Sequence, residues 1–145
     1  MSGNGSAVKK KTAEWLRLAD DDLRLARHAF KLKSAAPYKL IAYHAQQCAE
    51  KCLKAYLLFY NIDFPYTHDL AVLLELCPSS EHWTNDLRKA ATILRTYAIT
   101  TRYPGENRIT QKEALRAVAL AEMARKTITA ALAQEGLKIS IRAEK

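Results

Sequence analysis

The segment from about residue 37 to residue 60 constrains the fold most, because the helix that it predicts is apolar on nearly every side. Two sets of apolar residues recur at helical spacing and together cover most of its surface: Ile41, Ala45, Cys48, Cys52, Ala55 and Phe59, and then Ala42, Ala49, Leu53, Tyr56 and Tyr60. A helix with so little polar surface needs neighbours on several sides. We therefore expect it to be the most buried helix of a bundle.

Apolar spacing and capping signals predict four further helices. They cover about residues 12–32, a short stretch that Thr67 caps and Pro78 closes, about residues 80–101, and about residues 110–135. Thr110 and Glu113 have the spacing of a capping box at the start of the last helix. We expect an all-α, up-and-down bundle of about five helices with a four-helix-bundle-like core.

The 145 residues suit a single domain. We expect this helical domain at residues 12–136, after a disordered basic lead-in at residues 1–11 and before a tail at residues 137–145. No apolar run is long enough for a membrane span, and the lead-in does not resemble a secretory signal. We therefore expect a cytoplasmic protein that needs no cofactor.

The net charge of +8 favours acidic partners such as RNA, nucleotides or an acidic protein, although a basic surface alone explains it equally well. The three cysteines, Cys48, Cys52 and Cys77, lack the spacing of a zinc or redox motif. His44, Cys48 and Cys52 lie four residues apart on one helix, but buried thiols explain this pattern better than a metal site.

Two polar segments suggest a pocket between helices. Residues 43–54 place His44, Gln47 and Lys51 on an otherwise apolar helix, where such groups need partners. Residues 101–105 end another helix with Arg102 and Tyr103, which the following proline keeps out of helical geometry. We expect these segments to converge.

Arginines recur every seven residues along the fourth predicted helix, at Arg88, Arg95 and Arg102. They would form one positive ridge, and guanidinium groups beside Lys51 or Lys54 bind phosphate well. For Arg88 a solvated surface is an equal explanation. Another alternative is internal pairing, in which Gln47 and Glu50 clamp Arg95 or Arg102 without any ligand.

Histidine and aspartate residues admit structural explanations as well. His44 is the candidate acid–base group, although a histidine whose hydrogen bonds are satisfied inside the protein is the more common case. His68 and Asp69 are expected to tie down the connector before the third helix. Three consecutive aspartates, residues 20–22, are expected to form a solvated acidic face.

These segments resemble the HEPN domain (higher eukaryotes and prokaryotes nucleotide-binding) from about Trp15 to Leu132. The similar motifs are Gln-Gln-x-x-Glu-Lys-x-x-Lys from Gln46, Thr-His-Asp-Leu from Thr67, and Tyr97 leading to Arg102-Tyr103-Pro104. The resemblance implies a homodimer that binds a nucleotide or RNA, often beside a minimal nucleotidyltransferase encoded next to it. In such toxin–antitoxin pairs the transferase modifies a tyrosine near the arginine motif, and Tyr103 is the matching candidate.

The chain departs from the pattern of the HEPN members that cut RNA. They carry an arginine and then a histidine, with four to six residues between the two. Here no arginine is followed by a histidine at that spacing, and no histidine follows His82. Without that imidazole, proton transfer loses an agent worth ~10²–10⁴ in rate. We therefore expect a nucleotide- or RNA-binding partner with weak or no catalysis, whose site contains Arg95, Arg102, Tyr103, Gln47 and Lys51.

Two other functions stay open at this point. One is a metal-independent RNase toxin with an altered site, in which His44 is the acid–base group and Arg102 holds the scissile phosphate. The other is a non-catalytic structural adaptor whose polar groups only pair with one another.

Overall fold

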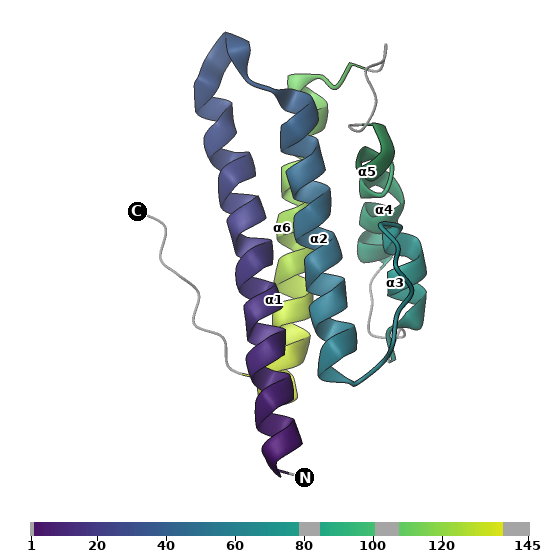
Figure 1. The fold of residues 1–145 in the computed structure, drawn as a ribbon. Coiled ribbons are helices and arrows are strands. Elements are labelled where there is room, and N and C mark those ends of the chain that lie inside the picture. The colour runs from purple at the N-terminus through teal and green to yellow at the C-terminus, as the bar shows by residue number, and fades with distance from the viewer. Residues whose placement is uncertain (1, 79–84, 101–107, 138–145) are drawn as a thin grey trace.

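The computed structural model of this chain describes residues 2–78, 85–100 and 108–137. Three long helices lie side by side, and three short helices run along one flank of the bundle (Figure 1). The long ones are α1 (Ser2–Ala29), α2 (Tyr38–Phe59) and α6 (Gln111–Gln134), and the short ones are α3 (Leu70–Leu76), α4 (Asn85–Leu94) and α5 (Tyr97–Thr100). A 3-10 helix, η1 (Phe30–Ala35), leads from α1 towards α2. The expected all-α bundle is confirmed.

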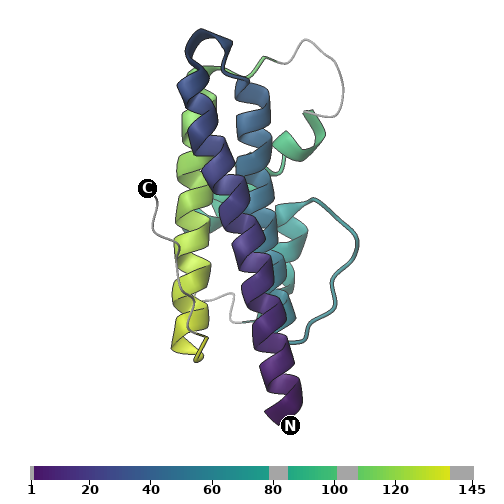
Figure 2. The same ribbon diagram turned by 60° about the vertical axis from the view of Figure 1, so that its left-hand side comes forward.

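Helix α2 is the centre of this bundle. It packs against α1 and α6 most extensively and also contacts α3, α4 and α5. The chain runs up through α1 and down through α2, rises along the connector and runs down again through α3 (Figures 1 and 2). It then rises through α4 and α5 and runs down through α6. Large side chains such as Ile41 and Leu57 on α2 and Ile128 on α6 are fully buried between these elements. The prediction that residues 37–60 form the most buried helix therefore agrees with the structure.

The ends of the long helices follow from local chemistry. Asn61 follows α2 with φ 56°, and the amides of Asn61 and Ile62 donate to the carbonyls of Leu58 and Leu57. This is a Schellman ending, in which asparagine tolerates the left-handed backbone. Gly136 ends α6 in the same way with φ 97°. At the start of α6 both bonds of the predicted capping box between Thr110 and Glu113 are formed.

Three boundaries differ from the sequence-based expectations. Helix α1 begins at Ser2, so residues assigned to a disordered lead-in continue the helix, although of these only Ala7 and the lysines at residues 9–11 are strong helix formers. The third helix has Asp69, not Thr67, as its N-cap, because the Asp69 carboxylate accepts from the Ala71 amide. The predicted fourth helix is divided into α4 and α5 by a turn at Arg95 and Thr96.

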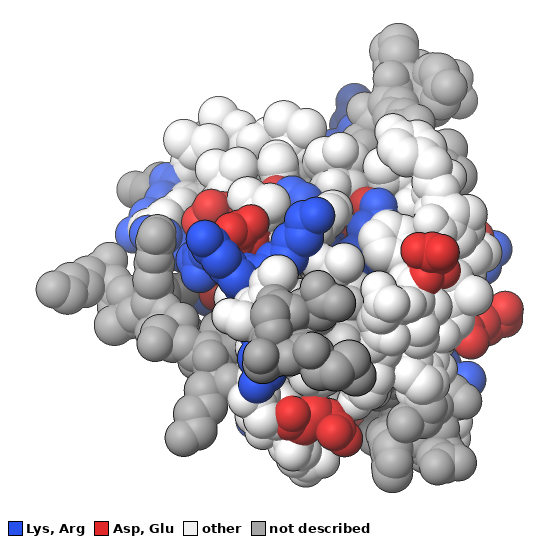
Figure 3. All heavy atoms as spheres, turned by 60° about the horizontal axis from the view of Figure 1, so that its bottom comes forward, with Lys and Arg blue, Asp and Glu red and all other residues white. Residues whose placement is uncertain are grey.

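Ion pairs on the flanks of the core join α1 to α6. Asp20 accepts two bonds from Arg125, one of them from Nη2 at 3.0 Å, and Arg27 pairs with Glu122. At the end of the bundle from which α1 starts, Lys and Arg side chains lie next to Asp and Glu side chains (Figure 3). The positive charge at this end is therefore mixed with negative charge and does not form one unbroken basic surface.

None of the described helices is both long enough and apolar enough to cross a membrane.

Candidate functional site

Solvent reaches only one narrow row of α2 between Ile41 and Leu57. Within this stretch Tyr43, His44, Gln47 and Lys51 are half-buried, and all other residues are buried. Residues three and four apart lie on one side of a helix, so positions 44, 47 and 51 form a continuous stripe, which we call the open row. The open row thus contains three of the predicted site residues.

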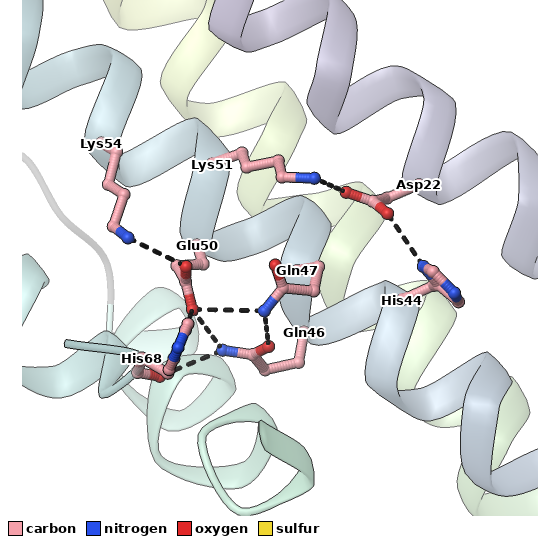
Figure 4. Close-up of polar contacts among 8 residues, drawn as sticks. All are labelled: Asp22, His44, Gln46, Gln47, Glu50, Lys51, Lys54 and His68. Carbon is pink, nitrogen blue, oxygen red and sulfur yellow. Dashed lines mark hydrogen bonds and ion pairs between the residues drawn. The ribbon is translucent and has the colours of Figure 1, made fainter. Parts of the chain in front are cut away.

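A buried carboxylate from α1 joins the two ends of the open row. Asp22 is 8 % exposed, and His44 Nδ1 lies 2.8 Å from its Oδ1. Lys51 Nζ donates to Oδ2 at 2.5 Å (Figure 4). With its proton on Nδ1, His44 has Nε2 as a hydrogen-bond acceptor, and two further protons of the Lys51 ammonium are available to other acceptors. We call Asp22, His44 and Lys51 the Asp22 cluster.

A second carboxylate, Glu50, lies on the neighbouring row of α2 and is 3 % exposed. Lys54 Nζ donates to its Oε2 at 3.0 Å, and His68 Nδ1 lies 2.9 Å from its Oε1. Gln46 Nε2 also donates to Oε1 at 3.0 Å, and Gln47 Nε2 reaches Oε1 at 3.4 Å. These residues form the Glu50 cluster, in which a buried negative charge is compensated by hydrogen bonds and by an ammonium group.

The Glu50 cluster fixes the connector between α2 and α3. Gln46 Nε2 donates to the backbone carbonyl of His68 at 3.0 Å, in addition to the His68 bond with Glu50. Asp69, next in the chain, caps α3. The expectation that His68 and Asp69 hold this connector agrees with the structure, although the main partner of His68 is a residue that sequence reasoning did not pair with it.

Arg95 lies beside the connector, in the turn that follows α4. Its Nη1 is 3.6 Å from Asp69 Oδ1, and the two side chains are 46 % and 37 % exposed. The expected clamp of Arg95 by Gln47 and Glu50 is absent among the described contacts, since Glu50 is compensated by Lys54 and His68. Helix α4 ends at Leu94, so Arg88 and Arg95 do not lie on one uninterrupted helix as the expected arginine ridge requires, and Arg102 lies outside the described residues.

Arg102 and Tyr103 lie outside the described residues, as does the whole segment 101–105 that was expected to converge with α2. Of the predicted site, the structure therefore brings together His44, Gln47 and Lys51 on the open row. It places Arg95 on the connector side of the Glu50 cluster.

The acidic run at residues 20–22 is not a solvated face. Asp20 pairs with Arg125 and Asp22 with His44 and Lys51, which leaves Asp21 as the exposed member. A signal for this was present in the sequence, because residue 22 lies three positions after Ala19 and four before Ala26, on the same apolar side of the helix.

No group of three or more possible metal ligands occurs within residues 2–78, 85–100 and 108–137. Cys48 and Cys52 are fully buried, and the hydrogen bond between their thiols, together with burial, raises the pKa of Cys48 well above its usual value. A thiol must lose its proton to bind zinc, so this environment disfavours metal binding.

Comparisons with known proteins point to one family. The family model of the HEPN domain matches residues 12–132. The crystal structure of TT1696 from Thermus thermophilus superposes with a TM-score of 0.73 and 28 % identity, covering 83 % of this chain and 97 % of that chain. The structure of ST0689, an archaeal HEPN homologue, does so with a TM-score of 0.64 and 25 % identity over the same shares of the two chains.

A comparison with curated proteins gives no match. The family model nevertheless covers most of the chain, and both solved structures share the bundle along nearly their whole length. On these grounds the chain belongs to the HEPN domain family.

Proposed function

We propose that this chain is a nucleotide- or RNA-binding HEPN domain, and that the open row of α2 forms the centre of its binding site. The observation that carries this proposal is that between Ile41 and Leu57 the residues of α2 are buried except for the open row and Tyr43. Lys51 and a protonated His44 offer positive hydrogen-bond donors to phosphate, and the Gln47 amide suits a base or a ribose hydroxyl.

The partner in this proposal is a minimal nucleotidyltransferase in a two-gene, toxin–antitoxin-like system. Arg102 adds a phosphate contact, and Tyr103 is stacked on a base or modified by the transferase.

Catalysis is weak or absent, because no histidine follows an arginine at the family spacing. We also infer a cytoplasmic location, since Cys48, Cys52 and Cys77 are free thiols of the kind that persist in a reducing compartment.

The test is a binding titration of short RNA and of single nucleotides at several salt concentrations. We expect Lys51→Gln and Arg102→Ala to weaken binding and to reduce its salt dependence. The matched control is Lys126→Gln, which removes the same charge from an exposed position on α6. Unchanged affinity and salt dependence in Arg102→Ala and Lys51→Gln would show that the assigned site is wrong.

A second function, metal-independent RNA cleavage, is supported by the contact between His44 and Asp22. A buried carboxylate on Nδ1 holds an imidazole in the orientation and tautomer that a general base needs. RNA cleavage by metal-free protein that disappears in His44→Ala would favour this function. Intact RNA after prolonged incubation with the wild type would exclude it.

A homodimer is also part of the proposal. Leu18 and Leu25 on α1 are 49 % and 53 % exposed, and they lie four residues before and three residues after Asp22. Leucines at this spacing share one side of the helix, so a second copy that covers them would also close over the Asp22 cluster.

A further inference from the structure

Tyr66 has an unusual position for an aromatic residue. It is 94 % exposed, more than any other large hydrophobic side chain that the structure describes. Tyrosine normally buries most of its ring, because the ring contributes a large apolar area. A single exposed hydrophobic residue needs no explanation by itself. The surroundings of Tyr66 are what make it informative.

The backbone on both sides of Tyr66 is anchored to α2. Before it, Phe64 is partly buried against the core and has the Lys54 ammonium 5.7 Å from its ring centroid. After it, His68 is held by Glu50 through its ring and by Gln46 through its carbonyl. Pro65 restricts the backbone between these anchors. Tyr66 is therefore an exposed ring on a tethered segment, and its presentation costs little entropy on binding.

The connector that presents this ring also contacts a group that binds phosphate, the Arg95 guanidinium. The rings of Tyr66 and His68 are 5.6 Å apart at an interplanar angle of 72°, so they are not stacked on each other, and the tyrosine side chain stays almost fully exposed. Asp69, three residues after Tyr66, holds Arg95 in a loose, largely exposed ion pair of 3.6 Å. Such a pair contributes little to stability, so the guanidinium can turn to a phosphate at small cost.

We propose that Tyr66 is a stacking platform for an unpaired nucleobase, and that Arg95 binds the phosphate attached to that nucleotide. This rests on the proposed function and specifies it, because it names a base-dependent contact on the connector. The buried Glu50 cluster then has a clear purpose, which is to hold the connector in the position that presents the ring. Lys54 and His68 act here as positioning residues and do not touch the ligand.

The experiment compares three ligands against wild type, Tyr66→Ala and Tyr66→Phe. The ligands are a fluorescent single-stranded oligoadenylate, an abasic oligomer with the same backbone, and AMP. We expect Tyr66→Ala to bind oligoadenylate roughly ten-fold more weakly, since stacking on an aromatic ring contributes this much per base. Tyr66→Phe keeps the ring and should bind like wild type, and the abasic oligomer should not distinguish the three proteins.

A matched control is Leu115→Ala, which removes an exposed side chain from α6. It should leave binding of all three ligands unchanged. Because Tyr66 is almost fully exposed, melting temperatures of its variants should equal that of wild type, which separates binding from folding. If AMP binding also depends on the ring, a single nucleotide is enough to occupy the platform. If oligoadenylate binding alone depends on it, the ligand is single-stranded RNA.

The outcomes separate this inference from the function on which it rests. Equal affinity of Tyr66→Ala and wild type for oligoadenylate, with weaker binding by Lys51→Gln, would overturn the stacking platform and leave the binding function standing. Loss of abasic-oligomer binding in Tyr66→Ala would also overturn it, because the effect would not need a base. A wild type that binds none of the ligands would overturn both.

Discussion

Single residues decide how the interior of α2 tolerates charge. Glu50 is the clearest case, because several donors converge on its carboxylate and Lys54 beside it is only 7 % exposed. Removing one partner of a buried ion pair leaves the other charge without compensation, which costs more than the pair contributes. The stability of the Glu50 cluster therefore depends strongly on the carboxylate of Glu50.

We expect Glu50→Gln to lower the free energy of unfolding by about 3–5 kcal/mol, because the Lys54 ammonium stays buried without its counter-ion. Urea denaturation measures this difference. Glu75→Gln, the same change at an exposed position on α3, should have little effect. Equal stability of Glu50→Gln and wild type would mean that Lys54 finds another partner or solvent.

At Thr12 we expect a substitution to raise the stability of the protein. It is fully buried, and its hydroxyl has no hydrogen-bond partner among the described residues. Thr12→Val keeps the shape and removes the unsatisfied hydroxyl, so we expect stability to rise by about 1 kcal/mol, the scale of such a penalty. Thr12→Ser keeps the hydroxyl and should not give this gain. Thermal unfolding measures both, and a less stable Thr12→Val would show that the hydroxyl is bonded in solution.

The sequence indicated which polar residues of α2 need hydrogen-bond or ion-pair partners, but it did not identify those partners. Contacts within one helix can be anticipated from spacing, as for Glu50 with Lys54 four residues later. Asp22 contacts Lys51 across 29 positions, and that pairing depends on the register at which α1 docks against α2. No local pattern determines this register.

Among the helices, α4 and α5 show where periodicity misleads. Apolar spacing predicted one helix over about residues 80–101, but the helix ends at Leu94. Thr92 and Thr96 donate their hydroxyls to the carbonyls of Arg88 and Ile93. Such bonds compete with the helical backbone bonds, and β-branched residues have low helical propensity. The composition of residues 92–96 was therefore a better guide to the helix end than the apolar spacing.

At the start of α6, by contrast, a local sequence pattern was a reliable guide. Its capping box was predicted from two residues, and both of its bonds are present. We expect Thr110→Ala to cost about 1 kcal/mol of stability, the usual value of an N-cap side chain. Adding Glu113→Ala should cost less than the sum of the single changes, since the two side chains act as one unit. Chemical denaturation of the single and double variants measures this, with Lys112→Ala as the neighbouring control. Additive losses would contradict the reciprocal box.

For the molecule as a whole, the bundle followed from apolar spacing, because each long helix needs its apolar side covered and few arrangements achieve this. The function of the surface depends on what assembles on it. Half-exposed leucines lie at helical spacing from members of the Asp22 cluster: Leu18 and Leu25 from Asp22 on α1, and Leu40 from His44 on α2. Burial of such side chains against a second copy would add favourable free energy of about 25 cal/mol per Å².

We therefore expect the wild-type protein to sediment as a dimer at micromolar concentration, and Leu25→Glu to sediment as a monomer. A carboxylate placed in an apolar contact without a partner loses its hydration, which destabilises the dimer but not the fold of each copy. Leu115→Glu is the matched control, because Leu115 is 51 % exposed on α6 and should tolerate the same change without dissociation. Analytical ultracentrifugation distinguishes the two states. A monomeric wild type would show that this contact does not form. A dimer that Leu115→Glu disrupts and Leu25→Glu does not would place the contact elsewhere. In either case the open row would have to bind its ligand within one chain.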